Sequence, residues 1–358
     1  MIKRINTDYV TAHMGKWHVC YDGNTMGYDV WDFGEGHDSW RRHNPQTVDP
    51  KDPKFIFSLT RKANAFIEKH AKAGQPFFIQ ISHYADHARY DALPETVEEY
   101  KTKHANKATE YHKDPVWAAM NENLDTGIGM VLDKLDELGI ADNTYVIYTA
   151  DNGYEDKDDQ RKPVEQRGYY KAYPQRSHKY TVSEGGIRVP FIVRGPGIPA
   201  NTHSATPVVG TDVYATVLDI LGGLDKAPEE VEGASLLDHL KSGGREPVER
   251  KDSFLVFKHS KPFRPHDIAI VEGHYKLIKD VSCTGKTYLY DLKNDIGEKV
   301  DLSDEEPERV KHMYDTMTSY FKRFDWDESM IRANSDVRRH RHAGAGRLPR
   351  QDEDRVYR

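Results

Sequence analysis

The sequence predicts an α/β fold followed by a smaller antiparallel unit. Over residues 115–138 apolar residues recur at steps of three and four, which is typical of an amphipathic helix. The apolar, β-branched run at 144–149 then predicts a buried strand, and helix plus strand make half of a parallel βα repeat. After about residue 245, alternating runs separated by turn residues predict a small antiparallel sheet.

Local patterns predict the other elements. The first 60 residues are rich in Trp, Gly, His and Asp with little periodicity, and we expect an irregular surface across the end of a sheet. Further helices are expected at 60–73, 211–222 and 306–324, further strands at 76–82 and 187–193, and alternating runs at 253–258, 267–280 and 286–292. From about residue 329 the chain loses hydrophobicity, which favours an extended or disordered basic tail.

Composition excludes several classes of protein. A net charge of −7 leaves no overall basic footprint for nucleic acid, and no run of 18 apolar residues could span a membrane. The N-terminus is charged without an apolar stretch, so no signal peptide is expected. Cys20 and Cys283 could form at most one disulfide, and the absence of metal-ligand spacing favours two isolated thiols.

The strand at 144–149 runs directly into Asp151, Asn152 and a glycine. Ligand sites of open α/β sheets gather beyond the carboxyl ends of strands, and side-chain oxygens of this kind suit Ca²⁺ or Mg²⁺ better than zinc. Taken alone, D-N-G is more often a plain turn. The polar loop 154–178, with Asp156, Asp158 and Asp159, could hold a second cation, although a solvated loop is the better interpretation.

Four short motifs occur in a characteristic order along the chain. They are G-K-W-H at 15–18, H-Y-A-D-H at 83–87, A-D-N-G at 150–153, and Lys179 five residues before E-G-G-I-R-V-P-F-I-V-R-G-P-G. This order resembles that of type I, formylglycine-dependent sulfatases, arylsulfatase-like members of the alkaline-phosphatase-like superfamily. The resemblance covers residues 8 to 325 and implies a mixed, mostly parallel sheet sandwiched by helices, with a C-terminal antiparallel α+β sub-domain.

The resemblance assigns a role to each motif. Lys16 and Lys179 correspond to residues that bind the sulfate group, as cations placed on developing negative charge would. His87 corresponds to the residue that protonates the leaving alcohol, and His18 to the partner of the nucleophile. The resemblance also implies a metal held by two further residues, Asp151 and Asn152, with Ca²⁺ expected and Mg²⁺ as the alternative.

Two features of the family are missing from the sequence. No strand ending in paired aspartates precedes G-K-W-H, and neither C-x-P-S-R nor C-x-A-S-R, the motif whose cysteine becomes formylglycine, occurs. We therefore expect a chain truncated at its N-terminus and inactive as given. His87 is followed by A-R-Y instead of the frequent T-P, and His83 is a second ligand candidate at the same edge.

The sequence favours a sulfuric ester hydrolase acting on a sulfated small molecule or carbohydrate, with a non-catalytic sulfated-glycan-binding remnant as the alternative. A related phosphoesterase or phosphonate hydrolase is disfavoured by the Lys-x-His pair and the K-x(4)-E-G-G pattern. The aromatic segment 21–43 could stack on sugars or pack on the sheet, and the basic tail could bind polyanions or be solvated. We expect domains at 1–245 and 246–328 and the tail at 329–358. The family implies a periplasmic or extracellular location.

Overall fold

The computed structural model describes residues 1–17, 23, 25–32, 49–87, 89–107, 112–155, 162–259, 267–281 and 283–325. Several sequence predictions lie outside these residues and are not addressed by the structure. They are the roles of His18 and Cys20, the second cation site at Asp156, Asp158 and Asp159, most of the segment 21–43, and the tail 329–358.

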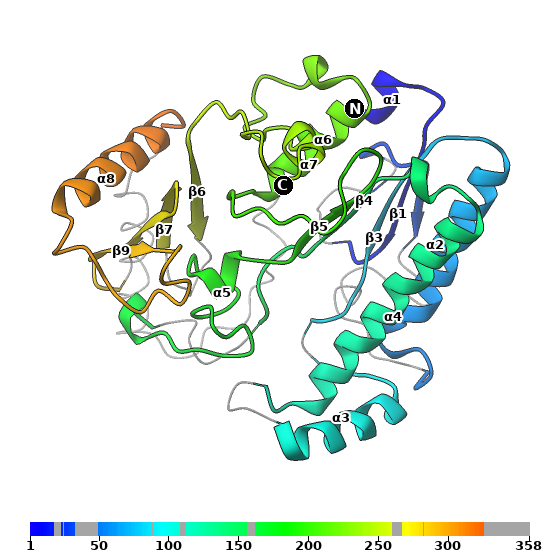
Figure 1. Ribbon diagram of the computed structural model, residues 1–358, viewed down its shortest axis with the longest axis horizontal. Coiled ribbons are helices and arrows are strands. Elements are labelled where there is room, and N and C mark those ends of the chain that lie inside the picture. The colour runs from blue at the N-terminus through cyan, green and yellow to red at the C-terminus, as the bar shows by residue number, and fades with distance from the viewer. Residues whose placement is uncertain are drawn as a thin grey trace, which may run out of the picture.

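A parallel sheet forms the centre of the larger part of the molecule (Figure 1). Its strand order is β2 (Val30–Asp32), β1 (Val10–Gly15) and β3 (Phe77–Ser82), and α2 (Ile56–Lys72) lies between β1 and β3 in sequence. The expectation of an irregular surface over the first 60 residues is therefore wrong at β1, which is the middle strand. A parallel strand covered on both faces does not alternate, and β1 buries even its polar residues.

Two long helices cover one face of this sheet (Figure 1). α4 (Pro115–Glu137) agrees with its prediction to within one residue, and its first turn is capped by Asp114, whose carboxylate accepts hydrogen bonds from two backbone amides. Gly127 lets α4 approach α2, because an added Cβ would lie 2.9 Å from the Ile56 side chain. α3 (Pro94–Lys107), which the sequence analysis missed, packs against α4.

A short antiparallel pair makes the α/β region mixed. β4 (Val146–Thr149) pairs antiparallel with β5 (Phe191–Arg194), and no parallel partner of β4 is present among the described strands. The predicted strand 187–193 begins too early, because α5 (Glu184–Ile187) and Pro190 precede β5. The remaining described helices are α1 (Ile2–Ile5), α6 (Gly210–Ile220), α7 (Leu237–Lys241) and the 3₁₀ turns Pro53–Phe55, Ala141–Asn143, Val164–Gln166 and Leu224–Lys226.

The C-terminal unit is an antiparallel sheet in the order β6 (Phe254–His259), β7 (Asp267–Glu272), β8 (Tyr275–Asp280) and β9 (Thr287–Asp291). The predicted run 267–280 is two strands, joined by a turn at Gly273, whose φ of 59° favours glycine. α8 (Pro307–Lys322) covers one face of the sheet, and residues from the segment 162–183 cover the other. The predicted fold class, a mixed α/β sheet with a small antiparallel α+β unit, is confirmed.

His13 in β1 makes the stability of the parallel sheet depend on pH. Its Nε2 lies 3.1 Å from the hydroxyl of Ser82, while its buried Nδ1 has no hydrogen-bond partner within the described part of the chain. Burial lowers the pKa of His13 from 6.5 to about 4. The unfolded chain therefore binds the proton first, and stability is lost as pH falls from 6.5 towards 4.

We expect His13→Gln to remove this contribution, which amounts to about 2 kcal/mol of unfolding free energy at pH 5. Urea titrations at pH 7 and pH 5 would show a smaller pH-dependent loss for the variant than for the wild type. An equal loss in the two proteins would contradict the assignment.

Candidate functional site

Lys16 and the segment carrying His87 start at the same edge of the parallel sheet. Gly15 and Ser82 are register partners at the carboxyl ends of β1 and β3, and the Lys16 amide donates to the Ser82 carbonyl at 2.7 Å. Gly15 has a φ of 93°, and an added Cβ would lie 2.2 Å from the Ser82 oxygen, so a larger residue would separate the strand ends. The geometry puts Lys16 where α/β sheets bind ligands.

A second lysine, which sequence reasoning missed, is buried near Lys16. Lys54 is 1% exposed, and burial lowers its pKa to about 8. The negative charge of Asp91 opposes this shift, whereas the positive charges of Lys16 and Arg89 add to it. The basic residues Lys16, Lys54 and Arg89 therefore lie near one another at this edge of the sheet, together with the carboxylates of Asp86 and Asp91. Only the burial identifies Lys54, since its sequence context is an ordinary Pro-Lys-Phe.

Asp151 and Asn152 follow β4 directly and are held in place by the glycine after them. The Gly153 amide donates to the Gly186 carbonyl at 3.0 Å, and an added Cβ at Gly153 would lie 1.9 Å from the Gly185 oxygen. The D-N-G turn and the E-G-G turn therefore pack directly against each other, and glycines are needed where their backbones meet. The Asn152 amide donates to the Asp151 carboxylate.

The two residues offer oxygen ligands of the kind that Ca²⁺ takes, so they fit part of a metal site. Ca²⁺ needs six to eight oxygens, and no group of three or more His, Cys, Asp or Glu residues gathers as a metal site within the described ranges. Asp151 and Asn152 therefore supply only part of a ligand set.

His87 and Lys179 meet at a carboxylate that the sequence analysis did not select. The Lys179 amide donates to the Tyr154 carbonyl at 2.8 Å, which aligns its segment with the chain leaving D-N-G. Glu155 Oε2 then lies 3.2 Å from His87 Nε2 and 3.8 Å from Lys179 Nζ. Glu155 was missed because it belongs to a charge-dense loop interpreted as solvated. Its position three residues after Asn152 was the only available signal.

His83, the second histidine candidate, has a different environment from His87. Burial lowers the pKa of His83 to about 4, so its imidazole is neutral at physiological pH. A histidine that acts as an acid catalyst must first carry the extra proton, and His83 does not carry it at this pH. This favours His87 over His83 as the proton donor.

The loop carrying Lys179 is anchored to the C-terminal sheet by buried ion pairs. Lys276 of β8 is fully buried, and its Nζ lies 2.7 Å from Glu184 and 2.8 Å from Glu298. Burial alone would raise the pKa of Glu184, but the charges of Lys276 and Arg188 outweigh it and hold that pKa below its usual range. Burial raises the pKa of Glu298. Lys276, a cation from the C-terminal sheet, thus fixes the position of the E-G-G turn.

A second buried pair fixes the start of the same loop. Arg167 and Asp267 of β7 lie 2.6 Å apart with both side chains fully buried, and Arg167 also donates to the Ser183 hydroxyl at 3.3 Å. Ser183 directly precedes the E-G-G turn. Both ends of the loop 167–184 are therefore tied to the C-terminal sheet.

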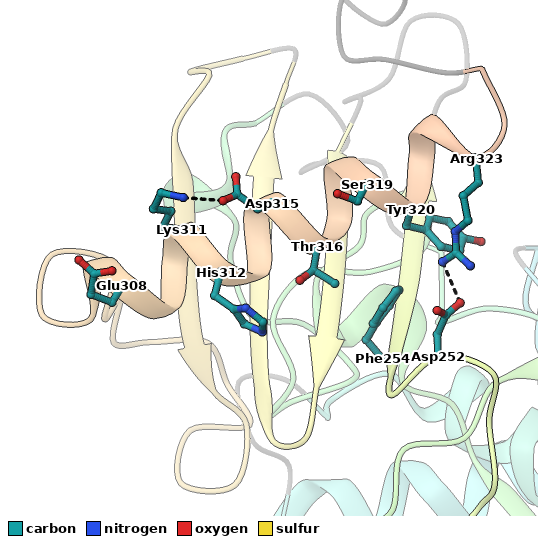
Figure 2. A pocket seen from close by; sticks show the side chains of 10 residues that line it. All are labelled: Asp252, Phe254, Glu308, Lys311, His312, Asp315, Thr316, Ser319, Tyr320 and Arg323. Atoms are coloured by element: carbon teal, nitrogen blue, oxygen red, sulfur yellow. Dashed lines mark hydrogen bonds and ion pairs between the residues drawn. The ribbon is translucent and has the colours of Figure 1, made fainter.

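A groove of about 660 Å³ lies elsewhere, between α8 and the start of β6 (Figure 2). Its lining residues are Asp252, Phe254, Glu308, Lys311, His312, Asp315, Thr316, Ser319, Tyr320 and Arg323. Arg323 pairs with Asp252 at 2.8 Å, and Lys311 pairs with Asp315 at 2.6 Å. Both of these cations are therefore paired with carboxylates of the groove.

Comparison with protein families matches the Sulfatase model to residues 6–223. The C-terminal model of N-sulphoglucosamine sulphohydrolase matches residues 151–329. A sulfatase of Formosa agariphila is 29% identical over 286 residues, which cover 74% of this chain and 49% of the relative. A putative extracellular sulfatase Sulf-1 homologue of Caenorhabditis elegans is 28% identical over 269 residues, covering 64% of this chain and 36% of the relative. The chain thus spans half or less of these curated relatives.

Solved structures show the same fold. Ps i-CgsB has a TM-score of 0.70 and 22% identity, covering 91% of this chain and 74% of its own. A protein solved in complex with its substrate D-glucosamine-2-N,6-O-disulfate has a TM-score of 0.66 and 18% identity, covering 91% of this chain and 82% of its own.

The buried Lys276 can be tested by Lys276→Met, which keeps an unbranched side chain one atom shorter and removes the charge. Glu298 would lose its cation and Glu184 would keep only Arg188, and we expect a loss of about 3–5 kcal/mol of unfolding free energy in urea titrations. Lys286→Met is the matched control, because Lys286 is 65% exposed and lies 3.7 Å from Glu165, so it should cost less than about 1 kcal/mol. Equal costs for the two variants would contradict the anchoring role.

Proposed function

Because the chain belongs to the sulfatase family, we propose that it is a sulfuric ester hydrolase whose site binds a sulfate ester carried by a carbohydrate. Turnover would require a nucleophile, and the formylglycine motif that supplies one in the family does not occur in this sequence. The observation that carries the proposal is the convergence of His87 and Lys179 on one carboxylate oxygen of Glu155. The two residues come from distant segments, after β3 and before α5. A proton donor and a fixed cation that reach the same atom can act on one ester group.

In this proposal each side chain has a separate role. Lys16 and Lys179 bind the sulfate oxygens and would offset the negative charge that grows as the sulfuryl group passes from the alcohol oxygen to a nucleophile, a group to which no residue of this chain is assigned. His87 gives a proton to the leaving alcohol oxygen. His18, proposed as the partner of the nucleophile, lies outside the described residues.

Family membership implies a metal, and we propose Ca²⁺ held in part by Asp151 and Asn152, with Mg²⁺ as the alternative. A bound divalent ion polarises the ester oxygens. Formylglycine is the family's nucleophile, and Cys283 does not fit that role. It is exposed between β8 and β9, on the C-terminal sheet, and no C-x-P-S-R motif surrounds it.

A sulfated sugar is the proposed substrate, supported by the disulfated glucosamine bound to one structural neighbour. Curated relatives include extracellular sulfatases, and we propose a periplasmic or extracellular location. No helix among the described residues has the length and apolar character to cross a membrane.

We expect Lys179→Ala to weaken binding of D-glucosamine 6-sulfate by roughly 10- to 100-fold, the cost of one charge-assisted contact, and to lower any sulfate release by a similar factor. Calorimetry measures the binding and ion chromatography the released sulfate. Lys69→Ala, on the exposed side of α2, is the control and should change neither.

If the wild-type chain binds the sulfated sugar but releases no sulfate, the result would support the alternative function, a non-catalytic sulfated-glycan-binding protein. Absence of both from the wild-type chain would contradict the proposed function.

The metal site has its own internal control, because a second Asp-Asn pair, Asp142-Asn143, stands at the other end of β4. We expect Ca²⁺ at 100 times its dissociation constant to stabilise the wild type by about 2.7 kcal/mol. Asp151→Ala should abolish this gain and Asp142→Ala should preserve it. Thermal unfolding with Ca²⁺ and with chelator measures the difference, and a gain that survives in Asp151→Ala would refute the ligand assignment.

A further inference from the structure

Glu155 is held between the two proposed substrate-binding groups by contacts on both carboxylate oxygens. Oε2 lies 3.2 Å from His87 Nε2 and 3.8 Å from Lys179 Nζ. Oε1 accepts a hydrogen bond from the Tyr180 hydroxyl at 3.3 Å. The side chain is 18% exposed, so it is partly enclosed. Glu155 therefore presents a negative charge at the point where the proposed site receives the anionic group of its substrate.

An incoming ester must replace Glu155 at His87 and Lys179. The Tyr180 hydroxyl bonds the other oxygen and keeps the carboxylate beside the site when this exchange occurs. The ester group is then bound next to a fixed negative charge. The repulsion scales with the charge of the ester group.

Sulfate and phosphate monoesters differ in this charge. A sulfate monoester has one negative charge, whereas a phosphate monoester carries two above its second pKa of about 6. One additional charge about 5 Å from a carboxylate weakens binding by roughly fourfold in a water-like medium, and by more in a partly enclosed site. The repulsion from Glu155 therefore weakens binding of the phosphate ester more than binding of the sulfate ester.

We infer that Glu155 is a specificity-determining residue, which shifts the preference of the site from doubly charged phosphate esters towards singly charged sulfate esters. The inference rests on the proposed function and extends it to the choice between two ester classes. Lys16, Lys54 and Lys179 attract the doubly charged phosphate ester more strongly than the singly charged sulfate ester, and the carboxylate opposes this bias.

The test compares calorimetric affinities of the full chain for D-glucosamine 6-sulfate and D-glucosamine 6-phosphate at pH 8, with Ca²⁺ constant. We expect Glu155→Gln to lower the sulfate-to-phosphate preference at least about fourfold, mainly through tighter phosphate binding. Glu155→Asp retains the charge and should retain much of the preference. Glu137→Gln removes one charge at the exposed end of α4 and should leave the preference unchanged, because surrounding salt screens it.

The outcomes separate this inference from the proposed function. If Lys179→Ala weakens both esters but Glu155→Gln leaves their ratio unchanged, the specificity role is wrong and the proposed site stands. If the wild type binds neither ester, the proposed function fails and the inference with it. Thermal unfolding of Glu155→Gln within a few degrees of the wild type shows that a changed ratio does not come from loss of the fold.

Discussion

Lys276 is the buried cation on which the position of the Lys179 loop depends. Its ammonium group lies between Glu184, at the E-G-G turn, and Glu298, after β9. Removing three charged groups from water is costly, and only their close mutual contacts offset that cost. The arrangement is therefore stable in one geometry, with the E-G-G turn against β8. Gly153 packs against this same turn, so the position of Asp151 and Asn152 follows from it.

The need for such an anchor follows from the nature of the loop. Between Arg167 and Ser183 the chain has no described helix or strand, and only one isolated bridge, Tyr169 with Arg176, crosses it. A segment of this kind cannot satisfy its polar groups alone. It gains rigidity by packing Val182 on the C-terminal sheet and by the Arg167–Asp267 and Lys276–Glu184 pairs. A cation on a rigid support keeps its place when an anion binds.

Sequence patterns predicted the elements whose burial is one-sided. α4 has an apolar stripe, a capping Asp114 and a terminal glycine, and its bounds agree to within one residue. β1 failed the same reasoning, because a strand covered on both faces shows no alternation and its Thr11 and His13 resemble loop residues. α3 was missed because most of its residues are charged and polar, which leaves a weak apolar stripe.

The residues of the candidate site also fall into two groups, those that sequence motifs identify and those that only the structure identifies. Lys16, His87, Asp151, Asn152 and Lys179 follow from short motifs, and the structure brings His87 and Lys179 together. Glu155 could not be selected from sequence, because carboxylates are common in such loops and its contacts depend on tertiary packing. Lys54 is similar, since only burial separates it from a solvated lysine.

The proposed boundary at residue 245 does not separate the hydrophobic cores, because Val164 and Val182 pack in one buried cluster with residues of the C-terminal sheet. The proposed site also depends on residues from both sides of this boundary. Lys16 and His87 depend on the parallel sheet, whereas Lys179 depends on β7 and β8 of the C-terminal sheet. The two family models overlap at residues 151–223, the stretch that contains the D-N-G and E-G-G turns. A shared segment is what this geometry requires, because His87 and Lys179, two residues of the proposed site, meet at Glu155 only when both sheets hold their parts of it. The C-terminal sheet is therefore part of the proposed site's architecture, although the ligand-facing residues all precede it.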